Sequence, residues 1–166
     1  MVTFVATPIG NLGDITLRAL ETLRAADVIF CEDTRHTLRL LNHFEIKTPL
    51  VACHTFTERA AAQKRSGLAR ERQELALVTD ADTPPLSARR NILVQALREA
   101  GIAYTLAPGA CAFVAALVLS GFSAERFAFL GFLRGKAGEK RALLQKYAGF
   151  EGTLLFYSAP QDVDGD

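Results

Sequence analysis

The sequence predicts an α/β domain whose strands form a largely parallel sheet, and two observations support this. Short apolar runs of strand length alternate with amphipathic segments of helical period from the first residue onward. The chain is also long enough to bury a core, because it has 166 residues of which 49% are hydrophobic. An alternating β-α-β order joins parallel strands, so the sequence favours one parallel sheet covered by helices.

Each element follows from its local pattern. Strands are predicted at the apolar runs 2–6, 28–30, 50–52, 75–78, 103–106, 127–130 and 153–157. Helices are predicted around 17–23, 38–41 and 92–97, and at 57–72, 110–119 and 139–147. Asp14 or Thr16 can cap the first helix, and Thr34 can cap the second. Gly101 and Gly121 are placed to end two later helices.

The pattern divides into two parts. Residues 1–120 contain five alternations and predict a first domain, whereas residues 121–166 contain only the β-α-β start of a second. The last strand-like run is followed almost at once by the acidic segment 161–166, so the second domain is expected to be incomplete and the chain shortened.

Composition excludes several classes of protein. The formal charge of +1 excludes an overall polycation, and no apolar run reaches the roughly 18 to 20 residues of a membrane span. The first residues lack a basic region and a cleavage site, so no signal peptide is expected. Cys31, Cys53 and Cys111 are dispersed, which is typical of reduced thiols. We therefore expect a cytoplasmic protein with no membrane partner.

The unusual loops of the chain all follow predicted strands. They bring glycine, proline, carboxylates and histidine to 7–11, 32–36, 54–55, 80–84 and 108–109. Ligands of open α/β sheets bind at the carboxyl ends of the strands, so these loops predict one site at one edge of the sheet.

Common motifs for nucleotide binding and phosphatase chemistry do not decide the function. The chain has no G-x-x-x-x-G-K-[ST] loop and no G-x-G-x-x-G fingerprint. Asp80 and Asp82 after an apolar strand could serve a magnesium-dependent phosphatase, although Thr83 comes one place too early for the D-x-D-x-T pattern. The same carboxylates could simply cap turns.

The spacing of histidines and basic residues bears on metal and nucleic-acid binding. His36, His43 and His54 are not paired at zinc-ligand spacing, so no metal is expected. Basic clusters at 64–72, 89–90 and 134–146 could follow a phosphate backbone, or they could be solvated helix faces.

Two long motifs point to a family. The run 5–16, VATPIGNLGDIT, and the run 31–37, CEDTRHT, with 40–43 and 47–50 behind it, resemble the small-subunit ribosomal RNA methyltransferase I family. That family belongs to the tetrapyrrole methylase superfamily. The resemblance continues at 108–109, 131–133 and 153–157, so it covers nearly the whole chain.

The resemblance implies a tetrapyrrole-methylase-like fold of two αβα domains, usually in a homodimer, with S-adenosylmethionine in the cleft between the domains. It implies transfer of a methyl group to a cytidine ribose 2′-hydroxyl of small-subunit (16S) rRNA. The residues it assigns to the methyl donor are Ile9, Asp80, Ala81, Thr83, Cys111 and Ala112. Those it assigns to the RNA or to the dimer are Thr34, Arg35 and His54.

A ribose hydroxyl is a weak nucleophile, so a nearby base or hydrogen-bond acceptor would help the transfer. Glu32, Asp33 and His36 are the candidates in the second motif.

The chain departs from the family pattern in the loop after the fourth predicted strand. Asp82 and Pro85 stand where the family has glycines, and 87–90 reads Ser-Ala-Arg-Arg where the family has Ser-Asp-Pro-Gly. Aspartate adds bulk and charge, and proline fixes φ and removes a donor. Two hypotheses therefore stand beside the phosphatase: an active methyltransferase, and an impaired relative that keeps the fold and an RNA or dimer contact.

Overall fold

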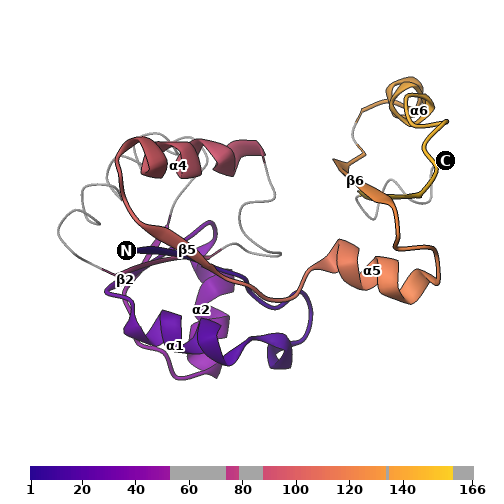
Figure 1. Cartoon of the computed structure of the whole chain (residues 1–166). Helices are drawn as coiled ribbons and strands as arrows, with labels where there is room; N and C mark the ends of the chain where they lie inside the picture. The colour runs from indigo at the N-terminus through magenta and orange to yellow at the C-terminus, as the bar shows by residue number, and fades with distance from the viewer. Residues whose placement is uncertain (53–73, 79–87, 134, 159–166) are drawn as a thin grey trace. The chain divides into compact units, whose positions relative to one another are not determined.

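The computed structural model describes residues 1–52, 74–78, 88–133 and 135–158 (Figure 1). The chain divides into two compact units, residues 1–111 and 112–166. This division lies earlier than residue 120, the boundary expected from the sequence, because helix α5 (Ala112–Ser120) packs with the strands that follow it. Each unit is described by itself below.

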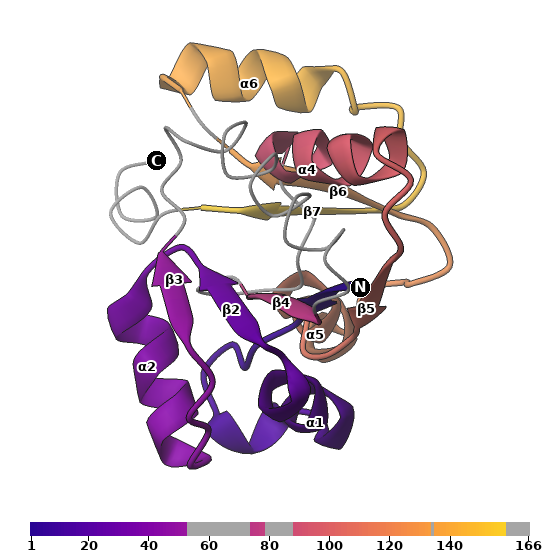
Figure 2. The ribbon, with the colours of Figure 1, turned by 90° about the vertical axis from the view of Figure 1, so that its left-hand side faces the viewer.

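The first unit is built on a five-stranded sheet of order β3-β2-β4-β1-β5 (Figure 2). Its strands are β1 (Val2–Val5), β2 (Val28–Cys31), β3 (Leu50–Ala52), β4 (Leu75–Val78) and β5 (Tyr104–Ala107). Every neighbouring pair is parallel. The α/β class with a parallel sheet is therefore confirmed, and the five strands lie where their apolar runs predicted them.

Side chains alternate across this sheet and create two cores. Helices α1 (Leu17–Ala25) and α2 (Thr34–His43) cover one face, where Leu23, Leu41 and Ile29 are buried together. Helix α4 (Ala88–Glu99) covers the other face, where Leu97 is buried with Phe4 and Leu77. Strands buried on both faces are apolar at successive positions, which explains the continuous runs in the sequence.

The helix ends test the predicted caps. Thr16 caps α1, because its hydroxyl accepts a hydrogen bond from the Ala19 amide at 3.1 Å. The prediction of Thr34 as the cap of α2 is wrong by one residue. Asp33 has extended backbone and its carboxylate accepts from the Arg35 amide at 2.8 Å, so Thr34 is already the first helical residue. Gly101 and Gly121 follow α4 and α5 with φ of 65° and 70°, as predicted for helix stops.

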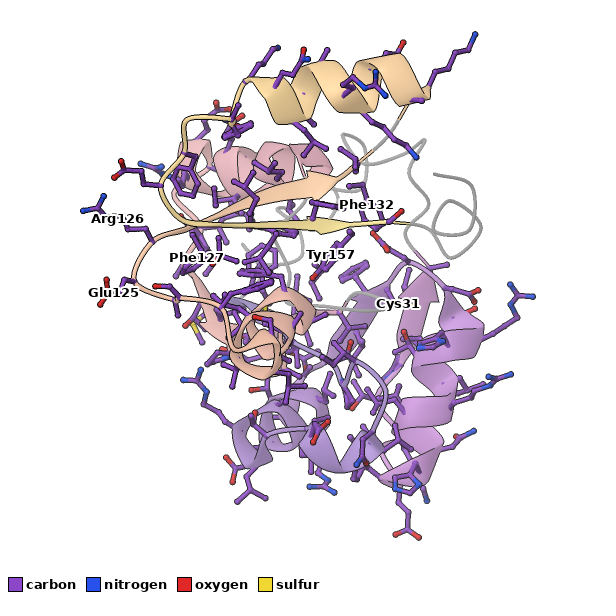
Figure 3. All side chains as sticks on the ribbon, turned by 90° about the vertical axis from the view of Figure 1, so that its right-hand side faces the viewer. Cys31, Glu125, Arg126, Phe127, Phe132 and Tyr157 are labelled. Atoms are coloured by element: carbon purple, nitrogen blue, oxygen red, sulfur yellow. The ribbon has the colours of Figure 1, made fainter. Side chains whose placement is uncertain are left out.

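The second unit contains α5, β6 (Phe127–Phe132), α6 (Ala137–Gln145) and β7 (Thr153–Tyr157). The two strands pair in parallel, with a register shift between Phe129 and Phe132 that coincides with the positive φ of Gly131. Phe113 of α5 stacks on Phe129 at a centroid distance of 4.4 Å. Figure 3 shows Phe132 and Tyr157 at the same end of the two strands.

Two further elements are a short 3-10 helix and helix α6. A short 3-10 helix, η1 (Leu12–Asp14), follows β1. Helix α6 begins two residues before the predicted start, since the Glu139 carboxylate accepts from the Lys136 amide and fixes the first turn there. The helix predicted at 57–72 lies outside the described residues. Within the described ranges, no helix has the length and apolar character needed to cross a membrane.

Candidate functional site

The sheet order brings the carboxyl ends of the strands to one edge. Because all strands are parallel, the carboxyl ends of β3, β2, β4, β1 and β5 lie along the same edge of the sheet in that order. After β1 the chain crosses to β2 through α1 on one face, and after β4 it crosses to β5 through α4 on the other face. The strand order therefore reverses between β1 and β4, where open α/β sheets place their binding crevice.

The loops after β1 and β5 lie against each other. The Ala6 amide donates to the Ala107 carbonyl at 3.0 Å. A Cβ atom on Gly109 would lie 3.0 Å from the Cβ of Ala6, so glycine permits this close approach. Ile9 and Cys111, on the two loops, are each half-buried, whereas a Cβ atom on Gly10 would meet no described atom within 4 Å. The pair of loops is thus tightly anchored at its base and open at Gly10.

Helix α1 is fastened to the same corner. The Thr16 hydroxyl donates to the Pro108 carbonyl at 3.5 Å, and the Arg18 guanidinium donates to the Leu106 carbonyl at 2.6 Å. Neither contact is predictable from the sequence, because the partners are separated by about ninety residues and no local pattern marks them.

The loop after β2 opens helix α2 with an ion pair. Both carboxylate oxygens of Asp33 accept from the Arg35 guanidinium, at 2.9 Å and 3.2 Å. Hydrogen bonds from the Arg35 side chain and amide lower the pKa of Asp33 to about 2, and the same carboxylate raises the pKa of Arg35. Asp33 is therefore occupied as a helix cap and an ion-pair partner.

The structure separates the predicted site residues into groups. Glu32, Asp33, Thr34, Arg35 and His36 come together in the first turn of α2 and the loop before it. Ile9 and Cys111 lie on the loops after β1 and β5. Strand β4 lies between β1 and β2, so the axes of β1 and β2 are two strand spacings, or about 10 Å, apart. Ala112 begins α5 in the second unit.

Several predicted residues cannot be placed. His54, Asp80, Ala81 and Thr83, and the Asp82 of the phosphatase hypothesis, lie outside the described residues. Among the residues that the structure describes, no group of three or more histidine, cysteine or acidic side chains could hold a metal ion.

The family is decided by a sequence comparison. The family model described as tetrapyrrole (corrin/porphyrin) methylases matches residues 1–165. The chain belongs to this family.

Two curated relatives of the chain have the same name. The chain is 47% identical over 156 residues to "Ribosomal RNA small subunit methyltransferase I" of Synechocystis sp., a match that covers 94% of this chain and 56% of the relative. The protein of the same name from Pseudomonas aeruginosa is 44% identical, with 94% and 55% covered. The methylase chain spans about half the length of these relatives.

Solved structures support the fold. The chain superposes on diphthine synthase with a TM-score of 0.79 at 16% identity, covering 96% of this chain and 64% of that structure. It superposes on uroporphyrin-III-C-methyltransferase from Thermus thermophilus with a TM-score of 0.61 at 25% identity, covering 81% and 60%. The tetrapyrrole-methylase fold predicted from the two motifs is therefore confirmed.

Proposed function

We propose that this chain takes part in S-adenosylmethionine-dependent methylation of small-subunit rRNA, with the 2′-hydroxyl of a cytidine ribose as the acceptor. The observation that carries the proposal is the identity of 47% to a relative named for this RNA, over 94% of the chain. The motifs at 5–16 and 31–37 begin at the last residues of β1 and β2, so they lie at the carboxyl edge of the sheet, where open α/β sheets place ligands. The reaction belongs to the cytoplasm, where ribosomal subunits are found.

The residues at the switch point suit S-adenosylmethionine, whose adenosine part needs an apolar, closely fitting pocket. Gly10 leaves open space beside β1, and Gly109 keeps the β5 loop against Ala6. The proposed ligands of S-adenosylmethionine are Ile9, Cys111 and Ala112, jointly with Asp80, Ala81 and Thr83. When bound, it supplies an electrophilic methyl group, and the protein provides position and electrostatics.

The first turn of α2 supplies the proposed acid–base groups. Glu32 is half-buried beside the end of β2, and His36 is exposed one helical turn away. Asp33 is a weak base, because its pKa of about 2 means that it holds a proton poorly at neutral pH. We assign proton acceptance from the ribose hydroxyl to Glu32 or His36, and a positioning role to Asp33 through Arg35. Thr34, Arg35 and His54 complete the proposed RNA contact, in a homodimer.

Transfer of a radioactive methyl group from S-adenosylmethionine to small ribosomal subunits tests this function. Activity is expected with the wild-type chain, and Glu32→Gln or His36→Asn should lower kcat by a factor on the order of 100 or more, whichever residue is the base. Glu99→Gln is the matched control, because it removes an exposed carboxylate from α4, away from the site. Equal activity in all variants would remove the acid–base assignment.

The impaired-relative hypothesis gives a different result in the same assay. If Asp82 and Pro85 obstruct the loop, the wild type transfers no methyl group, and Asp82→Gly combined with Pro85→Gly restores binding of S-adenosylmethionine. No gain in the double variant would show that these two side chains are not the obstacle.

A further inference from the structure

Helix α2 differs from the other described helices in its charges. Its outward side chains include Arg35, Arg39 and His43, and no aspartate or glutamate occurs between residues 34 and 44. Helices α1, α4 and α6 each mix cations with a glutamate, and α5 carries no charge. In a chain whose net charge is only +1, α2 is thus the charged helix among those described whose arginines have no carboxylate on the same helix.

The cations of α2 share one face. Thr37, Leu40 and Leu41 are buried against the sheet, so residues on the opposite side of the helix face solvent. Arg35, Arg39, Asn42 and His43 lie there at spacings of three and four residues, and all four are exposed. Figure 3 shows nitrogen-tipped side chains projecting outward along this helix. We call these four residues the α2 cationic face.

Arg35 and Arg39 differ in whether their guanidinium groups form an ion pair. The Arg35 guanidinium is held by Asp33 at 2.9 Å, whereas Arg39 forms no ion pair with any carboxylate in the described part of the chain. At the far end of the helix, Arg24 of α1 donates to the Phe44 carbonyl at 3.2 Å, which adds a further cation beside His43. The unpaired charge of Arg39 thus lies between two cations that the fold has fixed.

We propose that the α2 cationic face contacts the phosphate backbone of the substrate RNA, with Arg39 as its principal phosphate ligand. The proposal rests on the rRNA function proposed above. Arginine and asparagine side chains are common phosphate ligands, and such contacts position a nucleic acid without reading its sequence. The helix is about 15 Å long, follows the loop of Glu32 and carries His36 in its first turn, so it extends from the candidate site along the path of flanking nucleotides.

The test is binding of a fluorescein-labelled fragment of small-subunit rRNA, measured by polarisation at several salt concentrations. Arg39→Gln is compared with Arg98→Gln, which removes one exposed arginine from α4. Arg39→Gln should weaken binding about five-fold at low salt and reduce the slope of log K against log salt by about 1, whereas Arg98→Gln should leave both unchanged. Titration of the same samples with S-adenosylmethionine should give identical affinities, which confirms intact folding.

Three results overturn the proposal, and they are distinguishable. Equal RNA affinity of the two variants removes the α2 contact and leaves the proposed function standing. A wild type that binds S-adenosylmethionine but no RNA removes both the contact and the rRNA function. An Arg39→Gln variant whose sedimentation shows altered self-association, with unchanged RNA binding, assigns the face to a second copy of the chain instead.

Discussion

The Asp33 carboxylate accepts three hydrogen bonds from Arg35: one from the amide, which caps α2, and two from the guanidinium. Its pKa falls from 3.8 to about 2 in the folded chain. A carboxyl whose pKa is lower in the folded state stabilises that state above its unfolded pKa. The stabilisation is lost as the pH falls from about 4 through about 2.

Asp33→Asn tests this directly, because asparagine keeps the capping oxygen but removes the charge. The wild type should be more stable than the variant in urea at pH 6, and the difference should close as the pH falls through the window from about 4 to about 2. Glu99→Gln, which removes an exposed carboxylate elsewhere, should show no such closure. A difference that stays constant over this range would contradict the assigned contacts.

Residue-level contacts mark the limit of what the sequence could predict. The motif of Glu32 to His36 predicts a functional segment, but it did not reveal that the Arg35 guanidinium is held by Asp33. It also placed the cap of α2 on Thr34 instead of Asp33. Thr, Asp and Ser are almost equivalent caps, so local sequence cannot choose between neighbours.

Two helices of the first unit end in the same way with different residues. After α4, the Ile102 amide donates to the Leu97 carbonyl and Gly101 has φ of 65°. After α2, the Ile46 amide donates to the Leu41 carbonyl and Glu45 has φ of 55°. Both are Schellman ends that need a left-handed residue, and only Gly101 adopts this conformation without steric cost.

Glu45→Gly should therefore stabilise the protein by about 1 kcal/mol, and Gly101→Ala should destabilise it by about 1 kcal/mol. Urea unfolding at neutral pH measures both free energies. The two variants serve as controls for each other, because the hydrogen bonds of the two helix ends are equivalent. A loss of stability in Glu45→Gly would mean that the Glu45 side chain contributes more than its backbone costs.

Elements were predictable where burial imposed a period. Strands β1 and β4 are buried at every position, and their apolar runs marked them closely. Helix α6 was harder, because its start depends on a side chain that accepts from the Lys136 amide and its periodicity is interrupted by Gly138. Periodicity identifies an element, whereas capping contacts define its ends.

At the scale of the whole molecule, stability should depend on the core between the sheet and helices α1 and α2. Leu23 has no exposed surface there, whereas Leu38 of α2 is 48% exposed. Leu23→Ala should lower the free energy of unfolding by about 2 to 5 kcal/mol, and Leu38→Ala by less than about 1 kcal/mol. Chemical unfolding of both variants measures the difference. Similar losses would contradict the described packing of α1 on the sheet.

The fold followed from the sequence, because alternating strands and helices leave few topologies. The location of the site stays a prediction, which rests on polar loops that all follow predicted strands. The central position of β4 between β2 and β1 did not follow, since no local pattern encodes strand order. That position separates Ile9, after β1, from the loop of Glu32, after β2, and makes the edge between β1 and β4 the point where open α/β sheets place a binding crevice.

The central claim is that the crevice beside β1 binds S-adenosylmethionine, and calorimetric titration of Gly10→Leu tests it most directly. A side chain at Gly10 meets no described atom within 4 Å, so it should occupy ligand space without disturbing the fold; Gly149→Leu is the matched control, because Gly149 is equally open. We predict that the wild type and Gly149→Leu bind alike and that Gly10→Leu binds at least about ten-fold more weakly, with an unchanged Tm. No heat from the wild type, or equal affinity in Gly10→Leu, would contradict the claim.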